Sequence, residues 1–342
     1  MKVIYHENQK AHAAKTFLSN GAPQPNPEQP ERIDALLAGA QSEGLKLEVP
    51  PDYGLSAISR VHSPEYIYFL KNIYQRWQRI PDASEEVIPN IHPADRTSAY
   101  PKSAVGQVGY HVMDTSCPIT KDTFESVRWS ANCAVHAARL VVAGRSRVYS
   151  LCRPPGHHAG RDLVGGFCYL NNTAIASHYL IDQGFRPAII DVDLHHGNGT
   201  QSVFYSTPDV LTVSIHADPI RYYPFFWGHA DERGEGDGVG YNLNLPLPRG
   251  SGDDAFLTAL DSGLDRISLF SPNVLVVALG LDAFEGDPFG GLSITTAGFE
   301  KIGRACGGLN LPMLLVQEGG YLCAELGDNL AAFLRGCGTE GT

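Results

Sequence analysis

Residues 189–200 read IIDVDLHHGNGT, an apolar run that leads directly into acidic, imidazole and glycine residues. Asp191, Asp193 and His195 occupy alternate positions, and alternate residues of an extended strand face the same side. If the chain stays extended through His195, three side chains that can bind a metal point into one site just beyond a strand. Open α/β folds bind their ligands at this carboxyl edge of a parallel sheet.

The glycines that follow, Gly197 and Gly199, permit a tight turn, after which Asn198 or Thr200 is expected to cap a helix beginning near Gln201. An isolated acid or histidine at a strand end is more often a turn residue or a helix cap than a metal ligand. The metal interpretation therefore depends on further ligands at other strand ends.

The chain has 342 residues, which is long for one domain but within the range of α/β folds with one extended sheet. Its net charge of −11 argues against a nucleic-acid partner, because no basic stripe can neutralise phosphates, and is compatible with small cationic substrates. The seven cysteines form no Cys-x-x-Cys motif and predict neither a disulfide framework nor a thiolate zinc site. Without a secretory signal or an apolar run long enough to span a membrane, a cytoplasmic protein with no membrane partner is expected.

From about residue 122 the apolar pattern alternates between strand and helix periods, which predicts a parallel sheet covered by helices on both faces. Strands are expected at 2–5, 148–152, 188–191, 210–216, 274–279 and 313–317. Helices are expected at 31–44, from 64 onward, at 122–143, and near 172–183, 201–205, 253–269, 295–306 and 324–335. No internal repeat or linker divides the chain.

Residues 76–120 lack this alternation and contain several prolines. A stretch of this length without regular structure is usually a lid, a binding loop or a subunit contact when it lies inside a compact fold. A tolerated surface excursion is the alternative, and the functional interpretation is favoured.

Three other strand ends carry reactive side chains. The first of the later strands is followed by a rigid proline turn and by the adjacent His157 and His158, which are suited to general acid–base catalysis near neutral pH. The strand before Gly280 leads to Asp282. The last strand leads through two glycines to Tyr321, whose hydroxyl can be directed into the same cleft.

Asp193, His195 and Asp282 supply an oxygen, a nitrogen and an oxygen, and leave positions open for water and substrate, as catalytic zinc sites do. Ligands rich in carboxylate also admit iron(II), cobalt or manganese. A metal in this site would polarise a carbonyl and acidify a water molecule. His158 would take the water's proton and return it to a leaving amine, and Tyr321 would donate a hydrogen bond to the developing oxyanion.

Five ordered motifs resemble the histone deacetylase family, in particular its bacterial acetylpolyamine amidohydrolase branch, which has the arginase-like α/β fold. The motifs are RPPGHH at 153–158, GFCYLNN at 166–172, the stretch 191–200, GLD at 280–282 and EGGY at 318–321. The resemblance implies one deacetylase domain over 1–342, with a central, parallel eight-stranded sheet and helices on both faces. It also implies zinc on the three ligands named above, Tyr321 as oxyanion donor, His158 as base and acid, and His157 as its mostly cationic partner.

Asp191 is expected to orient a histidine from outside the set of zinc ligands. Family members also hold potassium near the zinc, and the resemblance assigns structural potassium ions to two sets of groups. The first set is the side chain and carbonyl of Asp191, the hydroxyl of Ser214, and the carbonyls of Asp193, His195 and Ile215. The second set is the carbonyls of Phe204, Thr207, Val210 and Tyr241.

One position departs from many nuclear members of the family, because Asn198 stands where they have an aspartate. An amide cannot stabilise an imidazolium as a carboxylate does, so His158 is expected to be less basic and better kept neutral. The acetylpolyamine branch shares this asparagine.

Residues 76–120 resemble the insertion with which acetylpolyamine enzymes form dimers and narrow the active-site tunnel, so a homodimer is expected. Asp114, at the tunnel entrance, is the candidate partner for a distal ammonium group. Aromatic side chains also resemble the walls that hold the methylene chain of the substrate, with ordinary core packing as the alternative. They are Phe167 and one of Tyr223, Phe225 and Phe226.

These features favour the zinc-dependent hydrolysis of N-acetylputrescine, N-acetylcadaverine or similar cationic amides to acetate and free amine. The nearest alternative is a protein acetyl-lysine deacetylase of the same fold and mechanism. An arginase-type hydrolase with two manganese ions is disfavoured, because Leu281 and Ala283 flank Asp282 where further carboxylates would be needed. A catalytically silent sensor of acetylated amines is disfavoured because every catalytic position is filled.

Overall fold

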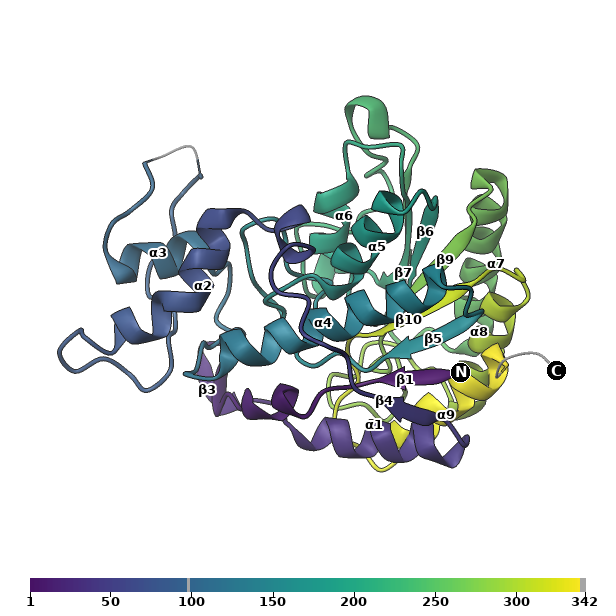
Figure 1. Cartoon of the computed structure of the whole chain (residues 1–342), viewed down its shortest axis with the longest axis horizontal. Helices are drawn as coiled ribbons and strands as arrows, with labels where there is room; N and C mark the ends of the chain where they lie inside the picture. Colours follow the sequence, from purple (N-terminus) through teal and green to yellow (C-terminus); the bar gives the residue numbers. More distant parts are fainter. Residues whose placement is uncertain (97–98, 339–342) are drawn as a thin grey trace.

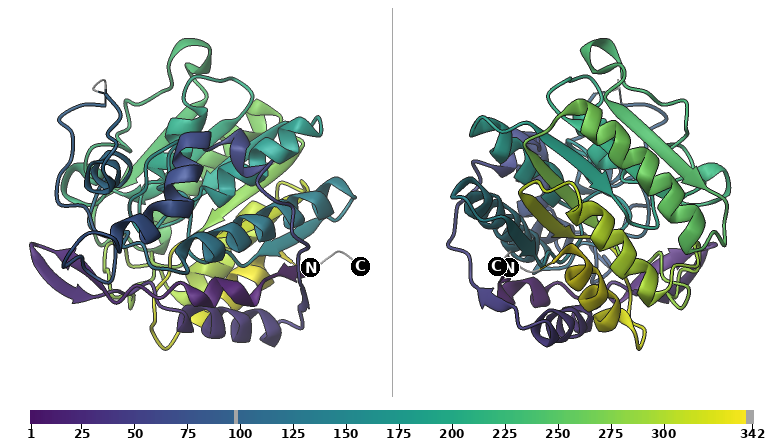
Figure 2. Two further views of the ribbon diagram at one scale, coloured as in Figure 1. Left: turned by 60° about the vertical axis from the view of Figure 1, so that its left-hand side comes forward. Right: turned by 90° about the vertical axis from the view of Figure 1, so that its right-hand side faces the viewer.

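The computed structural model describes residues 1–96 and 99–338, and within them the main sheet has eight strands that all run parallel (Figure 1). The strand order is β4-β1-β5-β10-β9-β6-β7-β8. A separate antiparallel hairpin of β2 and β3 projects from the body of the molecule (Figure 2). The strands are β1 (Lys2–Ile4), β2 (Thr16–Ser19), β3 (Ala22–Pro25), β4 (Lys46–Glu48), β5 (Arg147–Ser150), β6 (Pro187–Asp191), β7 (Leu211–Ala217), β8 (Asn242–Leu247), β9 (Val274–Leu279) and β10 (Met313–Gln317). The predicted parallel α/β fold is confirmed.

The central strands are buried on both faces because their residues are almost all apolar. β9 has the sequence VLVVAL, and every one of its residues is buried. β6 is buried in the same way as far as Asp191, where the strand ends. Apolar side chains point to both faces of such strands, so helices must cover the sheet on both sides.

Two layers of helices provide this cover. One apolar cluster joins the sheet to α1 (Glu31–Ser42), α7 (Asp253–Phe270), α8 (Thr296–Gly307) and α9 (Leu326–Cys337). The other joins it to α4 (Thr123–Val142), α5 (Asn172–Asp182) and α6 (Asn198–Phe204), and is extended outward by α2 (Pro64–Trp77) and α3 (Ala104–His111). The right-hand view of Figure 2 shows α7 and α8 side by side over their face. None of the helices in the described ranges is long and apolar enough to cross a membrane.

Two expectations around residues 191–200 are wrong. The extended conformation does not persist through His195, because β6 ends at Asp191 and the chain then bends. Neither predicted cap is used, since α6 begins at Asn198 after Gly197, which makes no side-chain capping bond. Asn198 instead contacts a histidine and Thr200 contacts an asparagine, so both side chains are engaged elsewhere.

The sequence also failed to predict the edge strands β4 and β8. β8 has the sequence NLNLPL, in which polar residues interrupt the apolar run, and within the described ranges it pairs only with β7. An edge strand needs less apolar surface than a central one, so its pattern is weaker.

Residues 76–120 are more ordered than predicted, because they contain α3 and a bridge between Val87 and Ile119. Ser103 caps α3 by accepting a hydrogen bond from the backbone N–H of Gly106. Two glycines in this short helix weaken the helical pattern of apolar residues in the sequence. One of them, Gly109, lies against the backbone of Ile91, where a β-carbon would not fit. Figure 1 shows α2 and α3 at one end of the molecule, away from the sheet. Residues 97 and 98 lie outside the described part of this segment.

Candidate metal and catalytic site

A cavity of about 530 Å³ opens at the carboxyl edge of the sheet, lined by residues that follow β5, β6, β7 and β10. His158, His195 and Tyr321 form its buried floor. The rim is the outer part of the lining, comes from loops, and consists of exposed and half-buried residues. Rim segments include the tip of the β2–β3 hairpin, residues 114–116, residues 221–225 and Arg249.

The structure brings together the three side chains predicted to bind a metal. Their ligand atoms lie within 4.8 Å of one another. His195 Nδ1 lies 3.3 Å from Asp193 Oδ1 and 3.1 Å from Asp282 Oδ2. Both carboxylates are fully buried, and the imidazole is nearly so.

Backbone groups hold the two carboxylates in place. Asp193 Oδ2 accepts a hydrogen bond of 2.8 Å from the N–H of Gly319, and Asp282 Oδ1 accepts one of 3.0 Å from the N–H of Leu194. Gly319 follows β10, so the ends of neighbouring strands fix each other's ligands. A β-carbon on Gly319 would collide with both carboxylates, which explains the glycine at this position.

The electrostatics of this group fit a divalent cation. Burial lowers the pKa of His195, but hydrogen bonds to Asp193 and Asp282 outweigh burial and raise that pKa to about 9. Burial and the neighbouring Asp193 raise the pKa of Asp282. Two buried carboxylates therefore face one imidazole, which is an oxygen–nitrogen–oxygen donor set open to the cavity. Such a set fits a catalytic zinc ion, and it also fits iron(II), cobalt or manganese.

The adjacent histidines have different partners and different charges. His157 Nδ1 lies 2.9 Å from Asp191 Oδ2, while His158 Nδ1 lies 2.7 Å from Asn198 Oδ1. Burial lowers the pKa of His157, but the charges of Asp193 and Asp191 outweigh it, and the pKa lies well above its ordinary value. Burial, reinforced by the cationic His157, holds the pKa of His158 well below its ordinary value. One imidazole is cationic and the other neutral at neutral pH.

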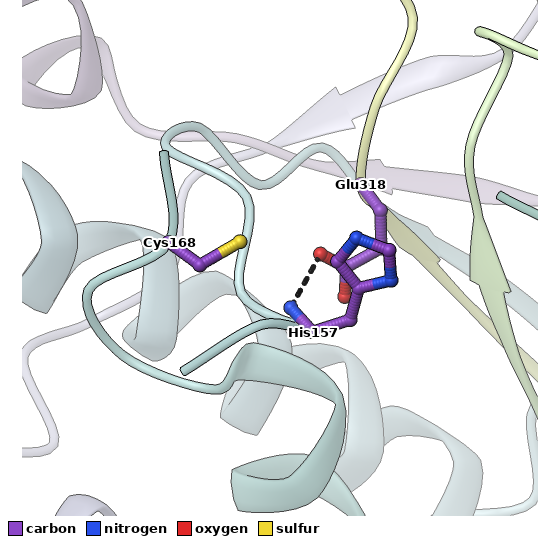
Figure 3. A group of neighbouring side chains, drawn as sticks. All are labelled: His157, Cys168 and Glu318. Atoms are coloured by element: carbon purple, nitrogen blue, oxygen red, sulfur yellow. Dashed lines mark hydrogen bonds between the residues drawn. The ribbon is translucent and has the colours of Figure 1, made fainter. Parts of the chain in front are cut away.

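Glu318 positions this pair and was not assigned a role from the sequence. Its carboxylate is fully buried and accepts hydrogen bonds from the N–H groups of Gly156, at 2.6 Å, and His157, at 2.9 Å. The Thr173 hydroxyl donates a third bond, of 2.7 Å. Figure 3 shows the Glu318 side chain next to the backbone of His157, joined to its N–H by a hydrogen bond, with the Cys168 thiol pointing toward them. Glu318 lies in the EGGY motif, but the sequence shows only that an acid follows a strand. It does not show which backbone N–H groups that acid will bind.

His157, Cys168 and Glu318 could also be considered as metal ligands, since their donor atoms lie within 4.8 Å of one another. Two properties argue against a metal there. His157 Nδ1 is already held by Asp191, and its ring is cationic. Burial raises the pKa of the Cys168 thiol well above its ordinary value, so the thiolate that a metal requires is disfavoured.

Tyr321 lies on the cavity floor with His158 and His195. Its ring packs against Phe289 and Phe167 at centroid distances of 4.7 and 5.7 Å, and its backbone N–H donates to Asp287 Oδ2 at 2.9 Å. The guanidinium carbon of Arg32 lies over the Tyr321 ring, 4.9 Å from the ring centroid. Among the described residues the Tyr321 hydroxyl has no hydrogen-bond partner, and burial raises its pKa well above the ordinary value. The group remains a proton-bearing donor that faces the cavity.

The predicted substrate-binding residues lie on the cavity wall, with one exception. Phe167, Tyr223, Phe225 and Asp114 line the cavity, while Phe226 does not and is 76% exposed. Asp114 is already heavily engaged. Its Oδ1 accepts bonds from the N–H and hydroxyl of Ser116, and its Oδ2 accepts from the N–H of Gly166 and the hydroxyl of Tyr223.

The two sets of groups predicted to bind potassium lie in different places: the first includes Asp191 at the carboxyl end of β6, and the second includes Val210 and Tyr241, which directly precede β7 and β8. Asp191 on β6 pairs with Ser214 on β7, and the Ser214 hydroxyl lies 2.8 Å from His216 Nδ1. In the second set, the Phe204 carbonyl accepts from the N–H of Thr207 and the Tyr241 carbonyl accepts from the N–H of Thr212. Potassium at either place stays a prediction, as it does for the carbonyls of Ile215 and Val210.

Comparison with known proteins supports a common ancestry for the whole chain. Residues 26–337 match the histone deacetylase domain. The chain is 41% identical over 339 residues to an acetylpolyamine amidohydrolase of Burkholderia pseudomallei, with 99% of each chain covered. It is 40% identical over 341 residues to acetylpolyamine amidohydrolase 1 of Pseudomonas aeruginosa, with 98% of each covered. The crystal structure of an acetylpolyamine aminohydrolase from Burkholderia pseudomallei matches with a TM-score of 0.96, at 41% identity and 98% coverage of both chains.

Proposed function

The chain belongs to the histone deacetylase family, and from this premise we propose that it hydrolyses acetylated polyamines to acetate and free amine. The observation that carries the proposal is an identity of about 40% to acetylpolyamine amidohydrolases over nearly the whole chain. We favour N-acetylputrescine and N-acetylcadaverine as substrates. The alternative substrate is acetyl-lysine in proteins, which the same floor residues would hydrolyse by the same mechanism.

We propose that Asp193, His195 and Asp282 bind one zinc ion. A bound zinc ion would polarise the acetyl carbonyl and make a water molecule acidic enough to react near neutral pH. The buried carboxylate pair and the single imidazole support this assignment. Leu281 and Ala283 flank Asp282 and offer no oxygen ligand to a second metal, which disfavours a binuclear manganese site.

The remaining floor residues move the protons. Neutral His158 takes a proton from the attacking water and then delivers it to the leaving amine. Cationic His157, held by Asp191, adds positive charge beneath the reacting group. The Tyr321 hydroxyl donates a hydrogen bond to the oxyanion as the carbonyl carbon becomes tetrahedral.

The cavity walls are proposed to hold the methylene chain of the amine. Phe167 is nearly buried at the inner end, and Phe225 is half-exposed at the outer end. Asp114 also lines the cavity and is the proposed partner of a distal ammonium group. Residues 76–120, which carry α3 and reach the cavity at Asp114, are proposed to narrow the entrance and to form a homodimer contact.

The decisive experiment assays acetylputrescine, acetylcadaverine and acetylspermidine beside acetyl-lysine peptides, with metal analysis of the same sample. We expect one zinc per chain and the highest kcat/KM on an acetylated diamine. Higher kcat/KM on the peptides would support the protein deacetylase instead. Two metal ions per chain would support the binuclear enzyme, and zinc-dependent binding without acetate release would support a sensor.

A further inference from the structure

Two arginines stand at the rim of the cavity. Arg221 ends the short helix η3 (Pro219–Arg221) after β7, and Arg249 follows β8 in the loop that leads to α7. Both side chains are exposed, and both line the cavity that contains His158 and Tyr321. The cavity lining therefore includes two guanidinium side chains together with the floor residues His158, His195 and Tyr321.

Neither arginine forms an ion pair with a carboxylate of the described residues 1–96 and 99–338. Arg249 donates to the carbonyl of Gly290 at 3.1 Å and lies 5.1 Å from the ring centroid of Tyr222. Arg221 makes no hydrogen bond or ion pair within residues 1–96 and 99–338. This is unexpected in a chain with 37 acidic and 26 basic residues, where partners are plentiful. The acid in the cavity lining, Asp114, is occupied by Ser116, Gly166 and Tyr223 instead.

We propose that Arg221 and Arg249 bind a carboxylate at the far end of the substrate, so that the site accepts free ω-N-acetylated α-amino acids such as Nε-acetyl-lysine in addition to acetylated diamines. Guanidinium groups match carboxylates in charge and in planar geometry. They repel an ammonium group in the same place. A substrate with both charges can present its carboxylate to the arginines and its α-ammonium to Asp114. The inference rests on the proposed function, because it takes the floor as the site of acetamide hydrolysis.

A purely structural role for Arg249 is the competing explanation. The Tyr222 hydroxyl donates to the carbonyl of Phe289 at 3.1 Å, so Tyr222 and Arg249 together hold residues 289–290 against the cavity. A clamp of this kind affects every substrate equally. A carboxylate site affects only substrates that carry a carboxylate.

The experiment uses two substrates that differ by one group, since N-acetylcadaverine is Nε-acetyl-lysine without its carboxylate. We expect the zinc-loaded enzyme to hydrolyse both compounds. Arg221→Gln and Arg249→Gln should each lower the ratio of the two kcat/KM values by roughly five-fold, through KM for the amino acid. The effect should shrink at high salt, because exposed charges are screened. Arg233→Gln is the matched control, because Arg233 is exposed, donates to a backbone carbonyl and lies outside the lining.

The other outcomes either overturn the proposal or show whether the carboxylate site or the proposed function is wrong. An unchanged ratio in both variants, or an equal loss on both substrates, would overturn it, and the equal loss would establish the clamp. If neither compound is hydrolysed, the proposed function is wrong. Calorimetric measurement of 6-acetamidohexanoate binding then tests the carboxylate site without relying on hydrolysis. Weaker binding to Arg221→Gln than to the unaltered protein supports the site, and equal binding overturns it.

Discussion

The floor and the rim of the cavity are built on different principles. The floor residues, and Asp193 and Asp282 beside them, are buried and lie just after strands, where backbone N–H groups from neighbouring strand ends hold the two carboxylates. Rim residues are exposed or half-buried and come from loops, and one of them, Arg221, has no polar partner among the described residues. A preorganised floor performs one reaction, whereas a loosely held rim can change to select the amine. Floor variants should therefore change kcat, and rim variants should change KM and substrate preference.

The largest effect is expected for Asp282→Asn. The amide oxygen can still accept from the N–H of Leu194, which preserves the fold, but the charge beside His195 is lost. We expect zinc to fall well below one per chain and kcat/KM to drop by on the order of 10⁴-fold or more, since a metal contributes several kcal/mol to such reactions. Elemental analysis measures the zinc content, and acetate release measures kcat/KM. Asp254→Asn, at an exposed position on α7, is the control. Full zinc content with full turnover would remove Asp282 from the site.

Tyr321→Phe should have the next largest effect. The ring contacts with Phe167 and Phe289 remain, and only the hydroxyl is lost. Loss of one oxyanion donor lowers kcat by on the order of 10²-fold or more, with zinc content unchanged. Tyr222→Phe, which removes a hydroxyl from the same cavity that donates to a backbone carbonyl, should keep kcat within a few-fold. Equal kcat for the Tyr321 variant and the unaltered enzyme would assign the oxyanion to another donor.

The difference between floor and rim also explains what could be predicted from the sequence. Asp193, His195 and Asp282 follow apolar strands, and the carboxyl ends of parallel strands meet at one edge, so their proximity could be predicted. The contacts of Glu318 depend on which turn packs beneath it, and no sequence pattern records that packing. The positions of Arg221 and Arg249 likewise follow from the folding of loops after β7 and β8, the second of which was not predicted as a strand.

Asn198→Asp tests whether His158 is the neutral base beside the cationic His157, through the pH dependence of kcat/KM. Burial and the cationic His157 keep the pKa of His158 low, and a carboxylate hydrogen-bonded to Nδ1 would stabilise the imidazolium and raise that pKa. The base must be neutral in the free enzyme, so kcat/KM is lost as the pH falls through this pKa. The acid limb should therefore move to higher pH by about one unit, with little change above it. Asn273→Asp, at an exposed position, should leave the profile unmoved. A shift to lower pH would contradict the role of His158 as base.

The smallest effect is expected where floor and rim meet, at the two phenylalanines of the wall. Phe225 is 50% exposed, so Phe225→Ala removes only part of a hydrophobic contact and should raise KM for acetylcadaverine a few-fold at constant kcat. Phe167 is 7% exposed and packs on Tyr321, so Phe167→Ala should also lower kcat by displacing the oxyanion donor. Steady-state kinetics on both variants separates the two parameters. If Phe225→Ala lowers kcat as much as Phe167→Ala does, the wall acts as one unit, and the boundary between a reacting floor and a selecting rim does not lie between these residues.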